Sequence, residues 1–227
     1  MKLLIANWKA QMNLSSIRTW TSEFNQFLKN DEKLIRHLNE KLFTIIICPP
    51  FPFLPLVKYD LRQYPFLKIG VQTVSTYENG KYTGEVTATA VKDFAEYAII
   101  GHSEQRAHRN LTEQNITDQL NHCKNNNIES VLCVSGEKNR LHDAKIIAYE
   151  PVEAIGTGQN AELEKVIAMK KTLNIDTNKT FLYGGSADQH NIEEYLKSGK
   201  IDGFLVGTAS LRAVSFYAMA QGMNRLL

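Results

Sequence analysis

The chain has 227 residues, of which 43% are hydrophobic, 26 are basic and 24 are acidic, giving a formal net charge of +2. This length and apolar content suffice for one sizeable core, so we expect a single domain over residues 1–227. The balanced charge gives no reason to expect nucleic acid or a membrane surface as a partner, although one or two well-placed cations would be enough to bind an anionic metabolite.

The cysteines and the N-terminal residues indicate in which cellular compartment the protein is expected. Cys48, Cys123 and Cys133 are an odd number without CxxC spacing, which argues against a disulfide framework or a zinc site and favours a reducing environment. The apolar run at residues 3–6 is too short for a signal peptide, and no stretch approaches the roughly 18 to 20 apolar residues that span a bilayer. We therefore expect a soluble, cytoplasmic protein.

Short apolar runs recur along the chain, each followed by a polar loop and an amphipathic segment. They predict strands at residues 2–7, 43–48, 67–72, 97–101, 130–134, 145–149, 180–184 and 203–207. Several are apolar at successive positions, as expected of strands covered on both faces. The helical patterns between them include residues 16–28, 112–124, 162–173 and 191–197, with plausible N-terminal caps at Ser15-Ser16 and at Thr112-Glu113-Gln114-Asn115.

Alternating strands and helices indicate parallel pairing with right-handed crossovers. Eight such units closing on themselves form a (β/α)8 barrel; the main alternative, an open doubly wound sheet, lacks the Gly-x-Gly-x-x-Gly motif after its first strand. Only a short segment around Ser135–Ala144 separates the fifth and sixth strands, whereas a crossover usually needs ~10–12 residues or more. We therefore predict an α/β barrel whose helix after strand five is very short or missing.

In such barrels the chemistry collects at the carboxyl ends of the strands. The predicted strands end near Asn7, Lys9, Gln72, His102 and Glu150. An amide, a cation, an imidazole and a carboxylate together form a proton-transfer set that needs no metal or other cofactor.

Each of these side chains has a functional and a structural interpretation. Glu150 ends an apolar strand, so partial desolvation would raise its pKa and make it a better base, unless it is solvated at the rim or paired with a lysine. If a helical turn opens at Ser103, its free amides would favour a neutral His102, although a lone histidine is more often structural. Lys9 would offset a phosphate dianion and stabilise an oxyanion, although a surface lysine is the commoner case.

The loops after the last three predicted strands are rich in glycine. Residues 151–158 follow Glu150 directly and are suited to hinging, while Gly184-Gly185 and Gly207 end the seventh and eighth strands. In these barrels the loops after strands seven and eight, with a short helix N-terminus, form the usual phosphate-binding site.

Taken in chain order, these motifs resemble the triosephosphate isomerase family. The matching stretches are Asn7-Trp8-Lys9, Thr83-Gly84-Glu85, Gly101-His102-Ser103-Glu104, Ala148-Tyr149-Glu150-Pro151, Ala154-Ile155-Gly156-Thr157-Gly158, Tyr183-Gly184-Gly185-Ser186 and Gly203-Phe204-Leu205-Val206-Gly207. The resemblance covers nearly the whole chain. It implies a cofactor-free enzyme that interconverts dihydroxyacetone phosphate and glyceraldehyde 3-phosphate.

The resemblance also implies individual roles. Glu150 would carry the proton through a cis-enediolate, with His102 as a neutral electrophile. The catalytic residues that support this pair would be those that hold the oxyanion (Asn7, Lys9), that orient Lys9 (Glu104) and that hold Glu150 at rest (Ser103). Residues that bind the substrate and its phosphate would be Asn7, Lys9, Gly156, Gly184, Gly185, Ser186, Gly207 and Thr208.

Two mobile or projecting segments follow from the same resemblance. The lid would comprise Pro151, Val152, Glu153, Ala154, Ile155, Gly156, Thr157 and Gly158, and in its closed state it would bond to Tyr183 and Ser186. The loop that carries Thr83, Gly84 and Glu85 would insert into a second copy of the chain, which implies a homodimer. The sequence leaves open whether dimers pair further into a tetramer.

Four features depart from the family pattern: Glu153 replaces the lid tryptophan of most bacterial and eukaryotic members, Thr208 replaces a glycine, Gln105 replaces an arginine, and the fifth helix is shortened. None of them touches a proposed catalytic residue. Two other functions remain open on the residues alone. One is an isomerase or lyase for a sugar or indole phosphate, and the other is a non-catalytic barrel that binds a phosphorylated metabolite as a sensor or scaffold.

Overall fold

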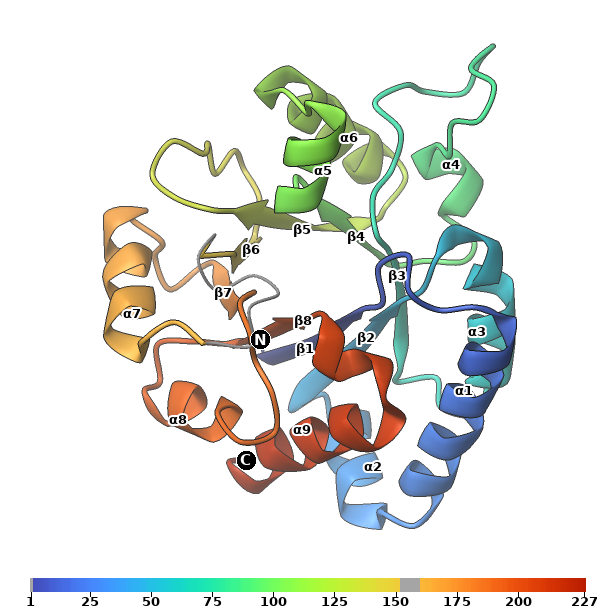
Figure 1. The fold of residues 1–227 in the computed structure, drawn as a ribbon, viewed down its shortest axis with the longest axis vertical. Coiled ribbons are helices and arrows are strands. Elements are labelled where there is room, and N and C mark those ends of the chain that lie inside the picture. The colour runs from blue at the N-terminus through green and yellow to red at the C-terminus, as the bar shows by residue number, and fades with distance from the viewer. Residues whose placement is uncertain (1, 152–159) are drawn as a thin grey trace.

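A computed structural model describes residues 2–151 and 160–227 (Figure 1). Within these ranges the strands pair in parallel with their neighbours in chain order, and the last pairs with the first to close a barrel. The strands are β1 (Lys2–Asn7), β2 (Phe43–Cys48), β3 (Lys68–Val71), β4 (Tyr97–Ile100), β5 (Glu129–Val134), β6 (Ile146–Tyr149), β7 (Thr180–Tyr183) and β8 (Gly203–Val206). The predicted (β/α)8 barrel is therefore confirmed.

Helices surround the barrel (Figure 1). They are α1 (Leu14–Lys29), α2 (Glu32–Asn39), α3 (Leu54–Asp60), α4 (Ala88–Val91), α5 (Ser103–Arg109), α6 (Glu113–Asn125), α7 (Leu163–Thr172), α8 (Ile192–Lys197) and α9 (Ala213–Arg225), with short 3-10 turns η1 (Phe51–Phe53) and η3 (Thr208–Leu211). The four helical patterns predicted from the sequence are confirmed to within two residues at each end. None of the helices in the described ranges is long and apolar enough to cross a bilayer.

The strands are apolar at successive positions because both of their faces are buried. In β1, for example, Leu3 and Ile5 point into the cluster that fills the barrel, whereas Leu4 and Ala6 join the larger cluster between barrel and helices. All four side chains are fully buried. Because successive side chains of a strand point to opposite faces, each strand contributes both to the core inside the barrel and to the core between barrel and helices.

Barrel closure depends on a glycine. Gly203 pairs with Leu3 across the β1–β8 junction and has a φ of +153°, and a Cβ there would lie 1.8 Å from the Leu3 carbonyl oxygen. No other residue fits that close backbone approach.

The helix starts show one confirmed and one wrong prediction. Thr112 caps α6, its side chain accepting from the Asn115 amide while the Asn115 side chain accepts from the Thr112 amide. The predicted cap of α1 at Ser15-Ser16 is wrong, because Asn13 is the N-cap and Ser16 is its reciprocal partner three residues on. The Ser16 hydroxyl accepts from the backbone amide of the cap residue Asn13, so it is the third residue of the helix rather than its cap. A serine is common at both positions, and for that reason the sequence placed the cap too late.

The fifth unit is reduced as predicted. Residues 135–145, between β5 and β6, contain turns and no helix. Several strands also end one residue earlier than expected: β4 ends at Ile100 because Gly101, at φ +69°, leaves the extended conformation. This turn directs the next residue, His102, toward the mouth of the barrel.

Candidate active site

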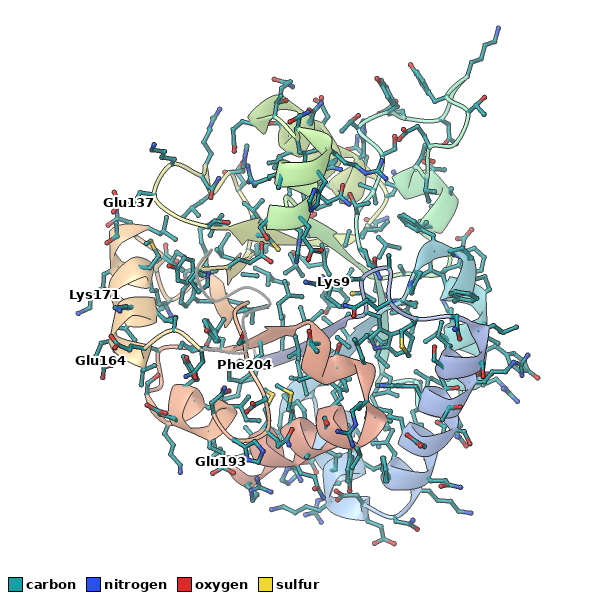
Figure 2. The ribbon with its side chains drawn as sticks, viewed as in Figure 1. Lys9, Glu137, Glu164, Lys171, Glu193 and Phe204 are labelled. Atoms are coloured by element: carbon teal, nitrogen blue, oxygen red, sulfur yellow. The ribbon has the colours of Figure 1, made fainter. Side chains whose placement is uncertain are left out.

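A cavity of about 400 Å³ opens at the carboxyl ends of the strands. Its walls come from the loops after β1, β4, β6, β7 and β8, and its lining residues are Asn7, Lys9, His102, Glu150, Gly184, Gly185, Ser186, Ala187, Asp188, Leu205, Gly207, Thr208 and Ala209. Figure 2 shows the Lys9 side chain extending from the loop after β1 toward the centre of the barrel. The structure therefore brings together nine of the residues that the sequence singled out.

Glu150 and His102 form a direct pair in this cavity. Glu150 Oε1 lies 2.8 Å from His102 Nε2, and the two residues are only 1% and 6% exposed. The second carboxylate oxygen accepts a hydrogen bond of 2.9 Å from the backbone amide of Ser103. Ser103 thus contacts Glu150 as expected, but through its main chain, since its buried hydroxyl has no hydrogen-bond partner among the described residues.

The start of α5 defines the tautomer of His102. His102 is the N-cap, and its Nδ1 accepts from the Glu104 amide at 3.2 Å, so this nitrogen carries no proton. In this geometry Nε2 is the nitrogen that can donate a proton, and it faces Glu150. The helical turn expected at Ser103 is present, because α5 begins at that residue.

Lys9 is held in a strained backbone conformation. Its φ is +50°, its amide donates to Asn7 Oδ1 at 3.1 Å, and its carbonyl accepts from Gln72 Nε2 at 2.8 Å. Because these two side chains anchor the backbone on both sides, the ammonium group is aimed across the cavity. From the sequence Gln72 is identifiable only as a strand-end residue, because its hydrogen bond to Lys9 depends on a contact between the segments that follow β1 and β3.

The ammonium group of Lys9 pairs with Glu104, with Nζ 2.6 Å from Oε1. Burial raises the pKa of Glu104, but the hydrogen bond and positive charge of Lys9 outweigh it, so the net pKa lies below the ordinary value. The carboxylate is therefore ionised at neutral pH, and it fixes Lys9 in place as the resemblance implied.

Two glycines give the Glu150 and Lys9 side chains room in the cavity. The Gly184 amide donates to Tyr149 O at 2.7 Å, so it is not available to a ligand; instead, a Cβ at Gly184 would lie 3.0 Å from Glu150 Cγ. Gly184 thus makes room for the Glu150 side chain. A Cβ at Gly207 would lie 3.4 Å from Lys9 Cε, which places the loop after β8 directly against the lysine.

The predicted lid lies mostly outside the described residues. Pro151 is described and buried, whereas residues 152–158, including Gly156, are not described. Just beyond them, the Tyr183 hydroxyl accepts from the Ala161 amide at 2.8 Å, and a Cβ at Gly185 would lie 2.2 Å from that hydroxyl. Gly185 therefore allows Tyr183 to reach the chain that follows the lid segment.

The expected subunit loop projects from the barrel after β3 (Figure 1). Thr83 and Gly84 are exposed, and Glu85 folds back to accept from Ser75 Oγ at 2.6 Å. Tyr77 and Tyr82 stack at 4.2 Å between ring centroids, although each is nearly half exposed.

Within residues 2–151 and 160–227, no group of three or more histidine, cysteine, aspartate or glutamate side chains could hold a metal ion. The fold and the cavity together define a class of protein: a (β/α)8 barrel with a buried carboxylate–imidazole pair and a fixed ammonium group facing glycine-rich loops. This is a site for proton transfer on a small anionic carbonyl compound.

Comparison with known proteins identifies the family within this class. The model of the family described as triosephosphate isomerase matches residues 2–223. The chain is 35% identical to the triosephosphate isomerase of Mesomycoplasma hyorhinis, over 94% of this chain and 95% of that protein. It is 32% identical to the enzyme of Thermus thermophilus, over 96% of both chains, and 34% identical to that of Dehalococcoides mccartyi, over 96% and 95%. The chain belongs to the triosephosphate isomerase family.

Proposed function

We propose that this protein interconverts dihydroxyacetone phosphate and glyceraldehyde 3-phosphate, with Glu150 as the base. As a member of the triosephosphate isomerase family it is an aldose–ketose isomerase. The observation that carries the residue assignment is the 2.8 Å pair between Glu150 and His102 at the wall of the cavity of about 400 Å³.

The first step is removal of a proton from C1 of dihydroxyacetone phosphate by the Glu150 carboxylate. The C–H electron pair becomes the C1–C2 double bond, and the carbonyl electron pair moves to O2, giving an enediolate. His102 Nε2–H donates to this oxygen, replacing the bond that it makes to Glu150 in the free protein. The neutral imidazole is an acid weak enough to share its proton with the enediolate without being consumed.

The second step completes the proton balance. The O1 hydroxyl proton passes to O2 through His102, and Glu150 returns its proton to C2, leaving an aldehyde at C1. Lys9, fixed by Glu104, supplies a positive charge next to the developing oxyanion, and Asn7 lies beside it at the end of β1. Charges that are already in place cost no reorganisation when the enediolate forms.

The phosphate group is bound by the loops after β7 and β8. The backbone amides of Ser186, Gly207 and Thr208 supply donors there, and Thr208 begins the short helical turn η3. Thr208 in place of glycine keeps the amide. The lid over residues 151–158, with Gly156 as a further donor, excludes water so that the enediolate does not lose its phosphate.

The active form is a homodimer in the cytoplasm. Two observations support self-association: the exposed Tyr77–Tyr82 stack on the loop after β3, and a groove of about 440 Å³ lined by residues of that loop, α5 and α6. Exposed aromatic pairs of this kind are typical of interface anchors. Thr83, at the tip of the loop, reaches the second subunit's site.

A coupled assay for conversion of glyceraldehyde 3-phosphate to dihydroxyacetone phosphate tests the proposal. The wild-type protein should turn over rapidly, and Glu150→Asp should lower kcat by about two to three orders of magnitude, because one methylene displaces the carboxylate by roughly 1 Å. Folded wild-type protein that binds phosphate ligands but shows no turnover would instead support the non-catalytic sensor or scaffold.

A further inference from the structure

The loop that replaces the fifth helix carries a buried imidazole. His142 lies within residues 135–145, has a left-handed backbone with φ +47°, and its side chain is only 9% exposed. A loop built of turns has little reason to direct a histidine inward at the cost of a strained backbone. The mechanism proposed above does not use this residue, so its position calls for another explanation.

His142 contacts a carboxylate at the start of α6. Its Nε2 lies 3.2 Å from Glu113 Oε2, while Glu113 Oε1 accepts from Arg106 Nη1 at 2.7 Å. Burial raises the pKa of Glu113, but the Arg106 and His142 hydrogen bonds and charges lower it further, so the net pKa is below the ordinary value. The carboxylate stays ionised, and it joins the loop after β5 to the guanidinium group of Arg106.

Arg106 carries the connection to the active site. Its Nε donates to the Gly101 carbonyl at 2.8 Å, and its Nη2 lies 3.1 Å from the position of a Cβ at Gly101. Gly101 is the left-handed residue that turns the chain out of β4 immediately before His102. The guanidinium group therefore clamps the peptide from which the His102 imidazole is presented to Glu150.

We propose that His142 is a positioning residue for the isomerase reaction, acting through Glu113 and Arg106 on the Gly101–His102 turn. This inference rests on the proposed function. The missing helix leaves the loop after β5 without a crossover element to hold it against α5 and α6, and the His142–Glu113 hydrogen bond supplies that attachment. Loss of the bond frees Glu113 and loosens the clamp that Arg106 makes on Gly101.

Two substitutions separate this role from a structural role of the loop. In His142→Gln the side-chain amide nitrogen is as many bonds from Cβ as Nε2 of histidine, so it can still donate to Glu113. In His142→Asn that reach is lost, but asparagine tolerates φ above zero better than glutamine does. If His142 acts through its hydrogen bond, the glutamine variant should keep the higher kcat. If only the backbone conformation matters, the asparagine variant should keep the higher kcat.

The expected result is a drop in kcat of about tenfold for His142→Asn, with KM changed by less than about twofold, because a sub-ångström shift of His102 slows the chemistry but leaves the phosphate site on β7 and β8 intact. His142→Gln should recover most of the kcat. His37→Asn and His37→Gln serve as controls, because His37 lies on α2, on the other side of the barrel from α5 and α6 (Figure 1).

Glu113→Gln tests the same connection if the His142→Asn variant does not fold. It should lower kcat similarly, and combining it with His142→Asn should cause little further loss, since both changes break the same connection. Equal kcat in wild type and His142→Asn, or fully additive losses, would overturn the inference. If wild type is active and Glu150→Asp is impaired, such a result leaves the proposed function intact; absence of wild-type turnover overturns both.

Discussion

Lys9 shows how a single residue is prepared for catalysis by its neighbours. Its left-handed backbone costs about 1–3 kcal/mol for a non-glycine residue, and that cost is met by bonds from Asn7 and Gln72 on either side. Glu104 then holds the ammonium group at 2.6 Å. The strain therefore fixes a cation in a cavity where a freely rotating lysine would spend most of its time in solvent.

Lys9→Ala should damage both binding and turnover. The Lys9 side chain lies against Gly207, a proposed phosphate donor, and its charge is proposed to stabilise the oxyanion, so we expect kcat to fall by about 10²–10³-fold and KM to rise. Steady-state kinetics on glyceraldehyde 3-phosphate checks this, with Lys33→Ala, an exposed lysine on α2, as the control. Unchanged KM and kcat would show that Lys9 is only a surface lysine.

The sequence predicts which residues lie at the site, but not which atoms of those residues make the contacts. The polar residues at strand ends were identifiable because parallel strands bring their carboxyl ends to one edge. By contrast, the Gly184 amide is used by Tyr149, and Ser103 holds Glu150 by its backbone rather than its hydroxyl. These details depend on backbone directions that residue identity alone does not specify.

Among the elements, the strands were the most predictable. Their double burial makes them continuous apolar runs, and each predicted run overlaps an observed strand. Helix α9 was not singled out, although Phe216, Met219, Ala220 and Met223 are buried with helical spacing. Its small and sulfur-containing residues lower the contrast between its two faces, and short helices such as α4 have too few residues to show a period.

The fifth unit shows what length alone can predict. Counting residues between two apolar runs is enough to exclude a full helix, and the structure confirms this. Counting says nothing about the attachment of the shortened loop. That attachment, by His142 to Glu113, pairs residues 29 positions apart, and no local pattern marks it.

For the whole molecule, the main prediction concerns its association into a homodimer. A homodimer and a single domain over residues 1–227 both stay predictions. Tyr82→Ser should shift the protein toward monomer at low concentration and lower its activity per subunit, because it removes half of the exposed aromatic stack. Sedimentation velocity over a dilution series measures this, with Tyr59→Ser, a still more exposed tyrosine on α3, as the control.

A monomer that keeps full activity at nanomolar concentrations would contradict the dimer and the reach of Thr83 into the second site. In that case the Tyr77–Tyr82 stack would be only a loop-stabilising contact.

In the proposed reaction Glu150 takes the proton from the substrate carbon. The most direct test is the turnover of Glu150→Gln, because the amide keeps the size of the side chain and its acceptor for the Ser103 amide but has no basic oxygen. We predict a loss in kcat of about 10³–10⁴-fold with competitive inhibition by inorganic phosphate unchanged. Turnover by Glu150→Gln within tenfold of the wild type would show that another group is the base.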